Sequence, residues 1–126
     1  MTIAFERTVP ILRMFSVEKT KEFYFDFLGF KLDWEHRFNE GAPLYMQISR
    51  GAAVLQLSEH FGDGTPGSAV YFYMKGIEEF QRELLSKNYR HARPGIHHQD
   101  WGMIEVMIDD PSGNKIRFGE PKLQGV

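Results

Sequence analysis

The two halves of this chain follow the same plan, and this duplication constrains the fold more than any other feature of the sequence. Each half is predicted to run strand, helix, strand, strand, strand. A stretch rich in turn-forming residues, Gly62-Asp63-Gly64-Thr65-Pro66-Gly67, separates the halves near the middle of the chain. A repeat in only two copies indicates a duplicated module, since a solenoid needs three or more copies.

The first half contains a clear helix between predicted strands. Residues 9–14 are expected to form a strand, with Pro10 near its start, where a missing hydrogen-bond donor is tolerated. A helix is predicted over residues 17–28, because Ser16 can cap its start and Gly29 can end it. Alternation of polar and apolar residues predicts three further strands, at residues 30–37, 44–49 and 53–58.

The second half repeats this order. A strand is predicted over residues 68–74 and a helix over residues 77–87, whose apolar residues recur at helical spacing. A short strand follows at residues 89–92. The last two strands, at residues 101–108 and 114–118, form a hairpin around a Pro-Ser-Gly turn.

Length and composition limit the possible functions. The chain has 126 residues, which suits a single domain of two repeats, about 7–60 and 68–120. A net charge of −2 argues against binding to nucleic acid, which needs a basic face. The absence of cysteine excludes disulfides, thiolate nucleophiles and Cys-ligated zinc. No apolar stretch has the length of a membrane span or the form of a signal peptide, so we expect a cytoplasmic protein without a membrane partner.

Alternation along the strands predicts which side chains face the helices and which face away. The side covered by helices should be apolar: Leu44, Met46, Ile48, Leu55, Leu57, Val70, Phe72, Ile104, Val106, Ile108, Ile116 and Phe118. The opposite side should carry Tyr45, Gln47, Gln56, Ser58, Tyr71, Tyr73, Met103, Glu105, Met107, Lys115 and Arg117. This second set is too aromatic for an ordinary solvated surface, and we expect it to form a concave face that holds a ligand.

Three stretches of the sequence resemble the vicinal-oxygen-chelate superfamily, the glyoxalase and bleomycin-resistance fold. They are residues 12–24 with the following Leu28-Gly29-Phe30, residues 54–60, and residues 110–118, which open with Asp110-Pro111-Ser112-Gly113-Asn114. The resemblance covers nearly the whole chain. It implies an α+β fold in which tandem βαβββ modules form a curved, half-barrel mixed sheet with the helices outside.

Enzymes of this superfamily hold a divalent metal with four side chains, and the resemblance locates the equivalent positions in this chain. They fall near Val9, at Gln56, near Ala69 and at Arg117. Valine and alanine cannot bind a cation, glutamine is a poor ligand, and arginine repels one. The sequence therefore predicts no family-type metal centre and no cofactor. It resembles most the metal-free bleomycin-resistance proteins, which sequester an antibiotic as homodimers.

The function predicted from these features is binding of a small organic molecule by a homodimer, rather than catalysis, and a bleomycin-type antibiotic is one candidate ligand. No catalytic residue or metal ligand is assigned. Flat side chains would stack on the ligand and polar ones would set its orientation. The predicted ligand-binding residues are Trp34, His36, Tyr45, Gln56, His60, Tyr71, Trp101, Glu105 and Arg117.

Two other functions stay open on the sequence. The first is a lyase or isomerase of the glyoxalase superfamily that uses His60 or Glu105 as general base. A metal outside the family pattern would then be held by a histidine set, namely His36, His60 and either His97 or His98. The second is an interaction module whose aromatic residues only form a dimer seam. Glu105 and Arg117, predicted on adjacent strands, could also pair with each other instead of binding a ligand.

Overall fold

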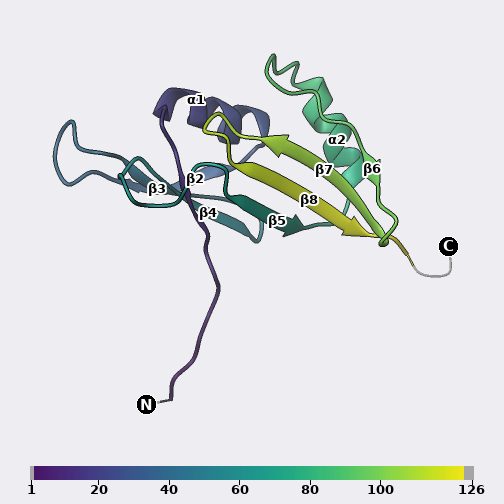
Figure 1. Cartoon of the computed structure of the whole chain (residues 1–126), viewed down its shortest axis with the longest axis horizontal. Helices are drawn as coiled ribbons and strands as arrows, with labels where there is room; N and C mark the ends of the chain where they lie inside the picture. Colours follow the sequence, from purple (N-terminus) through teal and green to yellow (C-terminus); the bar gives the residue numbers. More distant parts are fainter. Residues whose placement is uncertain (1, 124–126) are drawn as a thin grey trace.

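Each half of the chain forms one four-stranded mixed sheet in the computed structural model, which describes residues 2–123. The first sheet has the order β1-β4-β3-β2 and consists of β1 (Ile11–Arg13), β2 (Lys31–His36), β3 (Tyr45–Arg50) and β4 (Ala53–Ser58). The second has the order β5-β8-β7-β6 and consists of β5 (Ala69–Tyr73), β6 (His97–His98), β7 (Met103–Asp109) and β8 (Lys115–Pro121). The sheets lie side by side (Figure 1), which confirms the predicted fold class.

The two sheets share one pattern of strand pairing. The first strand of each half runs parallel to the last, β1 beside β4 and β5 beside β8, and the other pairs are antiparallel. In this register Ile11 lies opposite Gln56, and Tyr71 lies opposite Arg117. The equivalent pairings show that the duplication seen in the sequence is also a duplication of topology.

The first helix changes its winding part of the way along. Helix α1 (Val17–Lys21) begins at Ser16, whose Oγ accepts the backbone N–H of Lys19 at 3.2 Å. A π-helical stretch, η1 (Glu22–Phe27), then continues it, and the N–H of Leu28 donates to the carbonyl of Phe23 at 2.9 Å. The sequence predicted one regular helix at this place. The buried residues of the wider π-helical turns are aromatic: Phe23, Tyr24 and Phe27.

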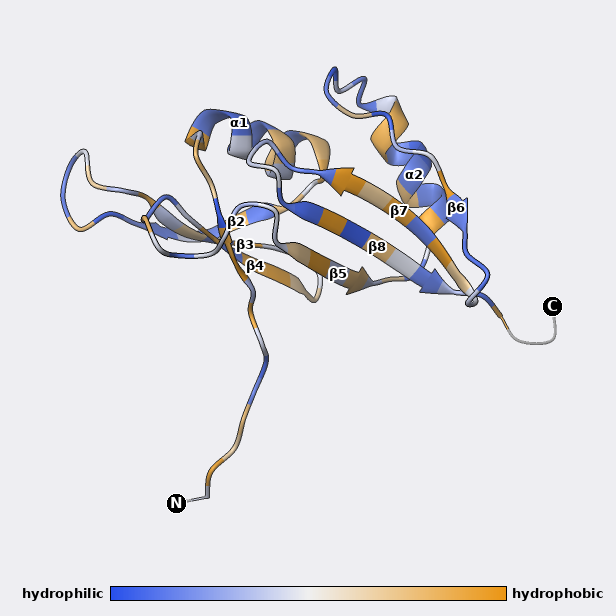
Figure 2. Ribbon diagram, in the orientation of Figure 1, coloured by the Kyte–Doolittle hydropathy of each residue, from blue (hydrophilic) through white to orange (hydrophobic). Residues whose placement is uncertain are grey.

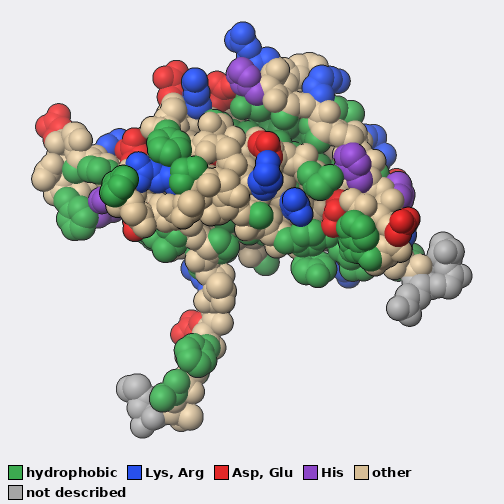
Figure 3. Space-filling model, in the orientation of Figure 1, with side chains coloured by type: hydrophobic (Ala, Val, Ile, Leu, Met, Phe, Trp, Pro, Cys, Tyr) green, Lys and Arg blue, Asp and Glu red, His purple; other side chains and the backbone are tan. Residues whose placement is uncertain are grey.

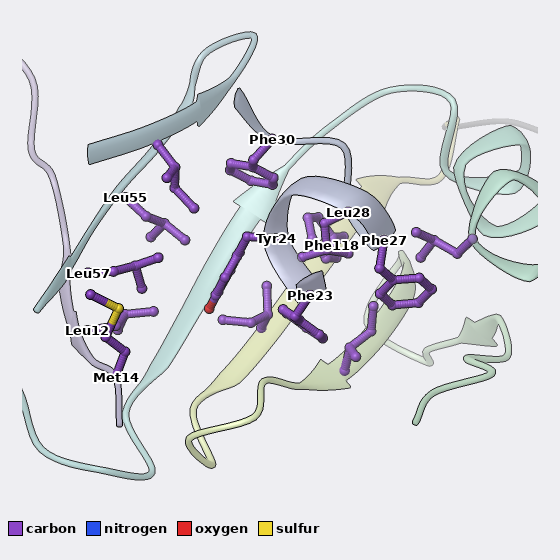
Figure 4. Packing of buried hydrophobic residues seen from close by; sticks show 14 of the residues in the cluster. Leu12, Met14, Phe23, Tyr24, Phe27, Leu28, Phe30, Leu55, Leu57 and Phe118 are labelled. Atoms are coloured by element: carbon purple, nitrogen blue, oxygen red, sulfur yellow. The ribbon is translucent and has the colours of Figure 1, made fainter. Parts of the chain in front are cut away.

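The core lies between the helices and one side of the two sheets. Both helical segments, α1 and α2 (Ile77–Ser86), cover the same side of the sheets (Figure 1), and α2 turns its apolar stripe inward (Figure 2). In Figure 4 the ring of Tyr24 lies between Leu55 and Leu57 of the first sheet and Phe118 of the second, and Phe23 and Phe27 lie near Phe118. The side chains predicted to face the helices are buried or partly buried, as expected. No helix within residues 2–123 is long and apolar enough to cross a membrane.

The predicted short strand at residues 89–92 is wrong. Tyr89 instead stacks on Phe27, with ring centroids 4.5 Å apart, and so joins the core beside the first helix. The carbonyl of Pro94 then accepts a hydrogen bond from Gln81 of α2 at 3.0 Å. The segment that pairs with β7 therefore follows Pro94 in the chain, and it is β6.

The Asp-Pro-Ser-Gly-Asn turn between β7 and β8 joins the two halves. Both oxygens of the buried Asp110 carboxylate accept hydrogen bonds, including the Tyr24 hydroxyl at 2.7 Å. Asn114 donates from Nδ2 to Asp110 at 3.0 Å and to the carbonyl of Arg13 at 2.8 Å. Burial, followed by the neighbouring Asp110, raises the pKa of Tyr24 well above its usual value. This motif therefore has a structural role.

Candidate functional site

The candidate site is the side of the two sheets that the helices leave uncovered, which we call the open face. In the first sheet, β3 contributes Tyr45 and Gln47 to this face, and β4 contributes Gln56. β2 contributes two consecutive residues, Asp33 and Trp34, because a bulge interrupts its pairing with β3. The bulge turns Asp33 toward Gln47, and a strictly alternating strand would not present both side chains on one face.

A group of aromatic rings, which we call the aromatic cluster, occupies one end of the open face. Trp34 stacks on Tyr45 with centroids 5.9 Å apart and ring planes 6° apart. The ring centroid of His60 lies 6.3 Å from that of Tyr45. The ring centroid of Phe38 lies 6.0 Å from that of His60 and 5.1 Å from that of His36. Trp34 is 42% exposed and Phe38 is 77% exposed. In Figure 3, hydrophobic side chains and a histidine lie together at the left end of the molecule, near the loop between β2 and β3. The cluster thus presents flat surfaces to solvent.

A row of hydrogen-bonded polar side chains, which we call the amide chain, crosses the first sheet beside the aromatic cluster. The hydroxyl of Tyr45 donates to Oε1 of Gln56 at 2.5 Å. Nε2 of Gln56 donates to Oε1 of Gln47 at 3.1 Å, and Nε2 of Gln47 donates to Asp33 at 3.1 Å. Lys31 and Ser49 also donate to Asp33, at 2.6 and 2.8 Å. The hydrogen bonds from Lys31, Gln47 and Ser49 lower the pKa of Asp33 to about 2.

On the second sheet, Tyr71 reaches across β8 to a carboxylate on β7. Its hydroxyl donates to Oε2 of Glu105 at 2.7 Å, and Nε2 of Gln99 donates to Oε1 of Glu105 at 3.0 Å. The ring passes over Gly119, where an added Cβ would lie 1.9 Å from the Tyr71 oxygen. Burial and the hydrogen bond to Glu105 raise the pKa of Tyr71 to about 12. Gly119 therefore makes this contact possible.

The structure separates several of the predicted site residues. Glu105 lies opposite Gly119 rather than Arg117, and no ion pair joins Glu105 and Arg117 among the described residues. Arg117 is exposed on β8 next to Tyr71. Trp101 is 68% exposed in the turn between β6 and β7, and it stacks on no other ring within residues 2–123. The aromatic cluster and Trp101 thus belong to different sheets.

The residues at the family's metal positions do not fit a metal ion. Both polar atoms of the Gln56 amide are already used in the amide chain, and Ile11 lies opposite Gln56. Arg117 brings a positive charge to the equivalent place on the second sheet. Residues 2–123 contain no group of three His, Cys, Asp or Glu side chains placed to hold a metal. The histidine set considered from the sequence does not assemble in one chain, because His97 and His98 lie on β6 of the second sheet.

Sequence reasoning missed one part of the site and one hollow beside it. Asp33 was not singled out, although its position after Leu32 on a bulged strand places it at the end of the amide chain. A hollow of about 570 Å³ lies outside the open face, where the two halves meet, between the β3–β4 turn, the β5 edge and α2. Tyr71 and Tyr73 line it beside an ion pair in which Arg50 contacts Glu83 at 2.7 Å. Nothing in the local sequence marks this hollow, because both halves form it.

Comparisons with known proteins agree with this architecture. A sequence model described as "Glyoxalase superfamily protein" matches residues 1–125. Similar solved structures include a bleomycin-binding protein in complex with bleomycin, at 24% identity over 94% of this chain and 100% of the other, with a TM-score of 0.67. An antibiotic-binding protein from Streptomyces has 18% identity over 96% of this chain and 100% of the other, with a TM-score of 0.68.

An enzyme shares the same fold. Lactoylglutathione lyase from Agrobacterium tumefaciens has 19% identity over 98% of both chains, with a TM-score of 0.69. The search of curated proteins gives no match. At these identities the solved structures establish the fold and leave the activity open, since the same fold serves binding proteins and an enzyme. The sequence match along almost the entire chain shows that this protein belongs to the glyoxalase superfamily.

Proposed function

We propose that this protein binds a small, flat organic molecule on its open face, without a metal ion and without chemical turnover. The observation that carries the proposal is the aromatic cluster beside the amide chain, on the face where related enzymes would coordinate a metal. Small-molecule sites combine apolar and aromatic walls with a few placed polar groups, and the open face offers both.

The proposed contacts divide by chemistry. Flat rings would stack on the ligand: Trp34, Tyr45, Tyr71 and Trp101. Polar groups would orient it: His36, Gln56, His60, Glu105 and Arg117. Glu105 is buried and carries a carboxylate, so it suits a cationic or N–H-bearing group of the ligand. A bleomycin-type antibiotic, sequestered by binding, is one molecule of this kind, and the similar structures include a bleomycin-binding protein and an antibiotic-binding protein.

No specific observation favours the lyase or isomerase alternative. A general base needs a neighbouring group that orients it. The side chain of His60 makes no hydrogen bond within residues 2–123, and the nearby Asp63 accepts from Ser58 at 2.9 Å instead. Both oxygens of Glu105 already accept hydrogen bonds from Tyr71 and Gln99. We therefore place binding ahead of catalysis.

A ligand screen tests the proposed function. Thermal-shift measurements with bleomycin and with aromatic dyes should find a stabilising ligand, and the affinity should not change after treatment of the protein with a chelator. Trp34→Ala should lower the affinity for that ligand about tenfold, because stacking on an aromatic ring contributes about 0.5–1.5 kcal/mol beyond area burial. Trp34→Phe keeps a flat ring and should restore most of the affinity. Fluorescence titration measures each constant.

Four results would count against the proposal. Loss of binding after chelation, or a stoichiometric divalent ion in protein purified without an affinity tag, would show a metal-dependent site. Equal affinity in wild type, Trp34→Ala and Trp101→Ala would show that the ligand lies elsewhere. Turnover of the bound molecule would favour the lyase or isomerase alternative.

A homodimer is part of the proposal. One sheet of the open face cannot enclose a ligand by itself, and both sheets expose apolar side chains, including Trp34 at 42% and Tyr73 at 76%. We expect sedimentation equilibrium to give twice the mass of one chain at micromolar concentration. Tyr73→Glu, which adds charge to this surface, should shift the equilibrium toward the monomer. A monomeric wild type that still binds the ligand would remove the dimer from the proposal.

A further inference from the structure

We propose that Asp33 determines the hydrogen-bond polarity of the ligand site: acting through Gln47 and Gln56, it makes Tyr45 an acceptor toward the ligand. The ligand group at this position is then an N–H or O–H donor, such as an aromatic amine or amidine. The inference rests on the proposed function and adds to it the chemical class of the ligand.

The direction of the amide chain follows from the chemistry of its last member. An ionised carboxylate only accepts hydrogen bonds, so Gln47 must turn its amide nitrogen toward Asp33. The carbonyl oxygen of Gln47 then faces Gln56, so Gln56 must donate a hydrogen bond to it from its amide nitrogen. The carbonyl oxygen of Gln56 is left facing Tyr45, so the single hydroxyl proton of Tyr45 points into the chain.

The consequence for a ligand is direct. Tyr45 has one proton, and Gln56 holds it, so the phenol oxygen can offer only a lone pair to a bound molecule. Reversing either amide would bring two donors or two acceptors together in a partly buried place, which costs the desolvation of both groups. Asp33 stays ionised at neutral pH, because the hydrogen bonds from Lys31, Gln47 and Ser49 lower its pKa to about 2. Asp33 is therefore a positioning residue.

The second sheet is arranged in the same sense. The proton of Tyr71 is held by Glu105, so Tyr71 also faces the site as an acceptor. The side-chain amide nitrogen of Gln99 donates a hydrogen bond to Glu105. The side-chain carbonyl oxygen of Gln99 is then available to a ligand. Arg117 is an exposed donor on the same side of this sheet. The two tyrosines thus favour a flat ligand that carries N–H groups.

Two related dyes test the inference. Proflavine and acridine orange share one cationic acridine ring system, and methylation of both amino groups removes their N–H donors in acridine orange. We expect wild-type protein to bind proflavine about tenfold more tightly, which is the effect of one lost hydrogen bond to a neutral partner. Fluorescence titration gives both dissociation constants. The ratio of the two constants is the readout, because a general loss of packing would not change it selectively.

Variants then assign the preference to the amide chain. Tyr45→Phe keeps the stacking ring and removes the acceptor of the first sheet, so the ratio should fall toward one. Asp33→Asn can present either oxygen or nitrogen to Gln47, so the chain loses its direction and the ratio should fall as well. Glu35→Gln is the matched control: it makes the same charge change on the same strand, but Glu35 faces the helix and contacts Lys21 at 3.2 Å. Its ratio should equal that of wild type.

The outcomes separate this inference from the function on which it depends. Equal binding of both dyes to wild type would overturn the donor preference and leave ligand binding intact. No binding of either dye would count against the aromatic site and against the inference together. A ratio that Tyr45→Phe abolishes and Asp33→Asn preserves would show that Asp33 does not set the polarity. In the free protein, the side-chain amide protons of Gln47 and Gln56 should exchange more slowly in wild type than in Asp33→Asn, and equal exchange would also overturn the role of Asp33.

Discussion

Asp110→Ala is expected to lower the free energy of unfolding by about 3–5 kcal/mol, the largest stability effect predicted for this chain. The carboxylate accepts hydrogen bonds from the Tyr24 hydroxyl and from the side-chain amide of Asn114. It also accepts hydrogen bonds from the backbone N–H groups of Ser112 and Asn114. Tyr24 and Asn114 are fully buried, so water cannot replace the lost acceptor. Urea denaturation measures the change, and the melting temperature should fall by roughly 10–15 °C.

The neighbouring carboxylate provides a matched control. Asp109→Ala makes the same charge change one residue earlier, but Asp109 is exposed, and within residues 2–123 its carboxylate pairs with the exposed Lys115 at 3.1 Å. Its effect should stay within about 0.5 kcal/mol, as for most surface ion pairs. Similar losses in both variants would mean that charge, rather than the buried hydrogen bonds of the turn, governs stability at this turn.

Gly119→Ala is expected to disconnect Tyr71 from Glu105 without unfolding the protein. The new Cβ would lie 1.9 Å from the Tyr71 oxygen, which is the far end of a side chain that can swing away. The backbone of Gly119 does not have a positive φ, so alanine needs no change of backbone conformation. Ligand affinity should fall about tenfold, because Tyr71 and Glu105 lose the geometry of the open face.

The pKa of Tyr71 reports this change directly. It is about 12 in the wild type and should return toward 10 in Gly119→Ala, which ultraviolet titration against Tyr71→Phe resolves. Because folding raises this pKa, the Tyr71 contact stabilises the wild type below pH 10 and is lost as the pH rises toward 12. The stability of Gly119→Ala should not show this loss between pH 10 and 12.

Gly95→Ala is the control for this substitution. No atom lies within 4 Å of a Cβ added there, and its φ is not positive either. It should bind and titrate like the wild type. A wild-type pKa for Tyr71 in Gly119→Ala would mean that the ring tolerates the added methyl group, and that Gly119 is not required for the contact between Tyr71 and Glu105.

Much of the fold was predictable from local patterns. The strand at β4 has the predicted bounds, and the other predicted strands of the first half differ by one or two residues at their ends. Helix α2 begins at Ile77, as predicted. Gly29 ends the first helical segment, as predicted, with a positive φ of +75°. These features depend on residues close together in the chain, where side-chain alternation, capping and glycine conformations act.

The errors arose where distant residues compete with local preference. Residues 89–92 alternate as a strand does, but Tyr89 is drawn into the core by Phe27, far away in the sequence. The π-helical turns at Glu22–Phe27 likewise bury several neighbouring aromatic side chains that a regular helix was expected to hold. Local periodicity contains no information about such partners, so no pattern in the sequence could have found them.

For the site, the sequence by itself determined the duplicated fold, the polar and aromatic character of the open face and the lack of family-type metal ligands. These follow from residue identities and from alternation along each strand. Only the tertiary structure decided the partners: Glu105 with Tyr71 instead of Arg117, and Asp33 with Gln47. Strand register and the bulge in β2 determine which side chains meet, and both are set by packing between segments far apart in the chain.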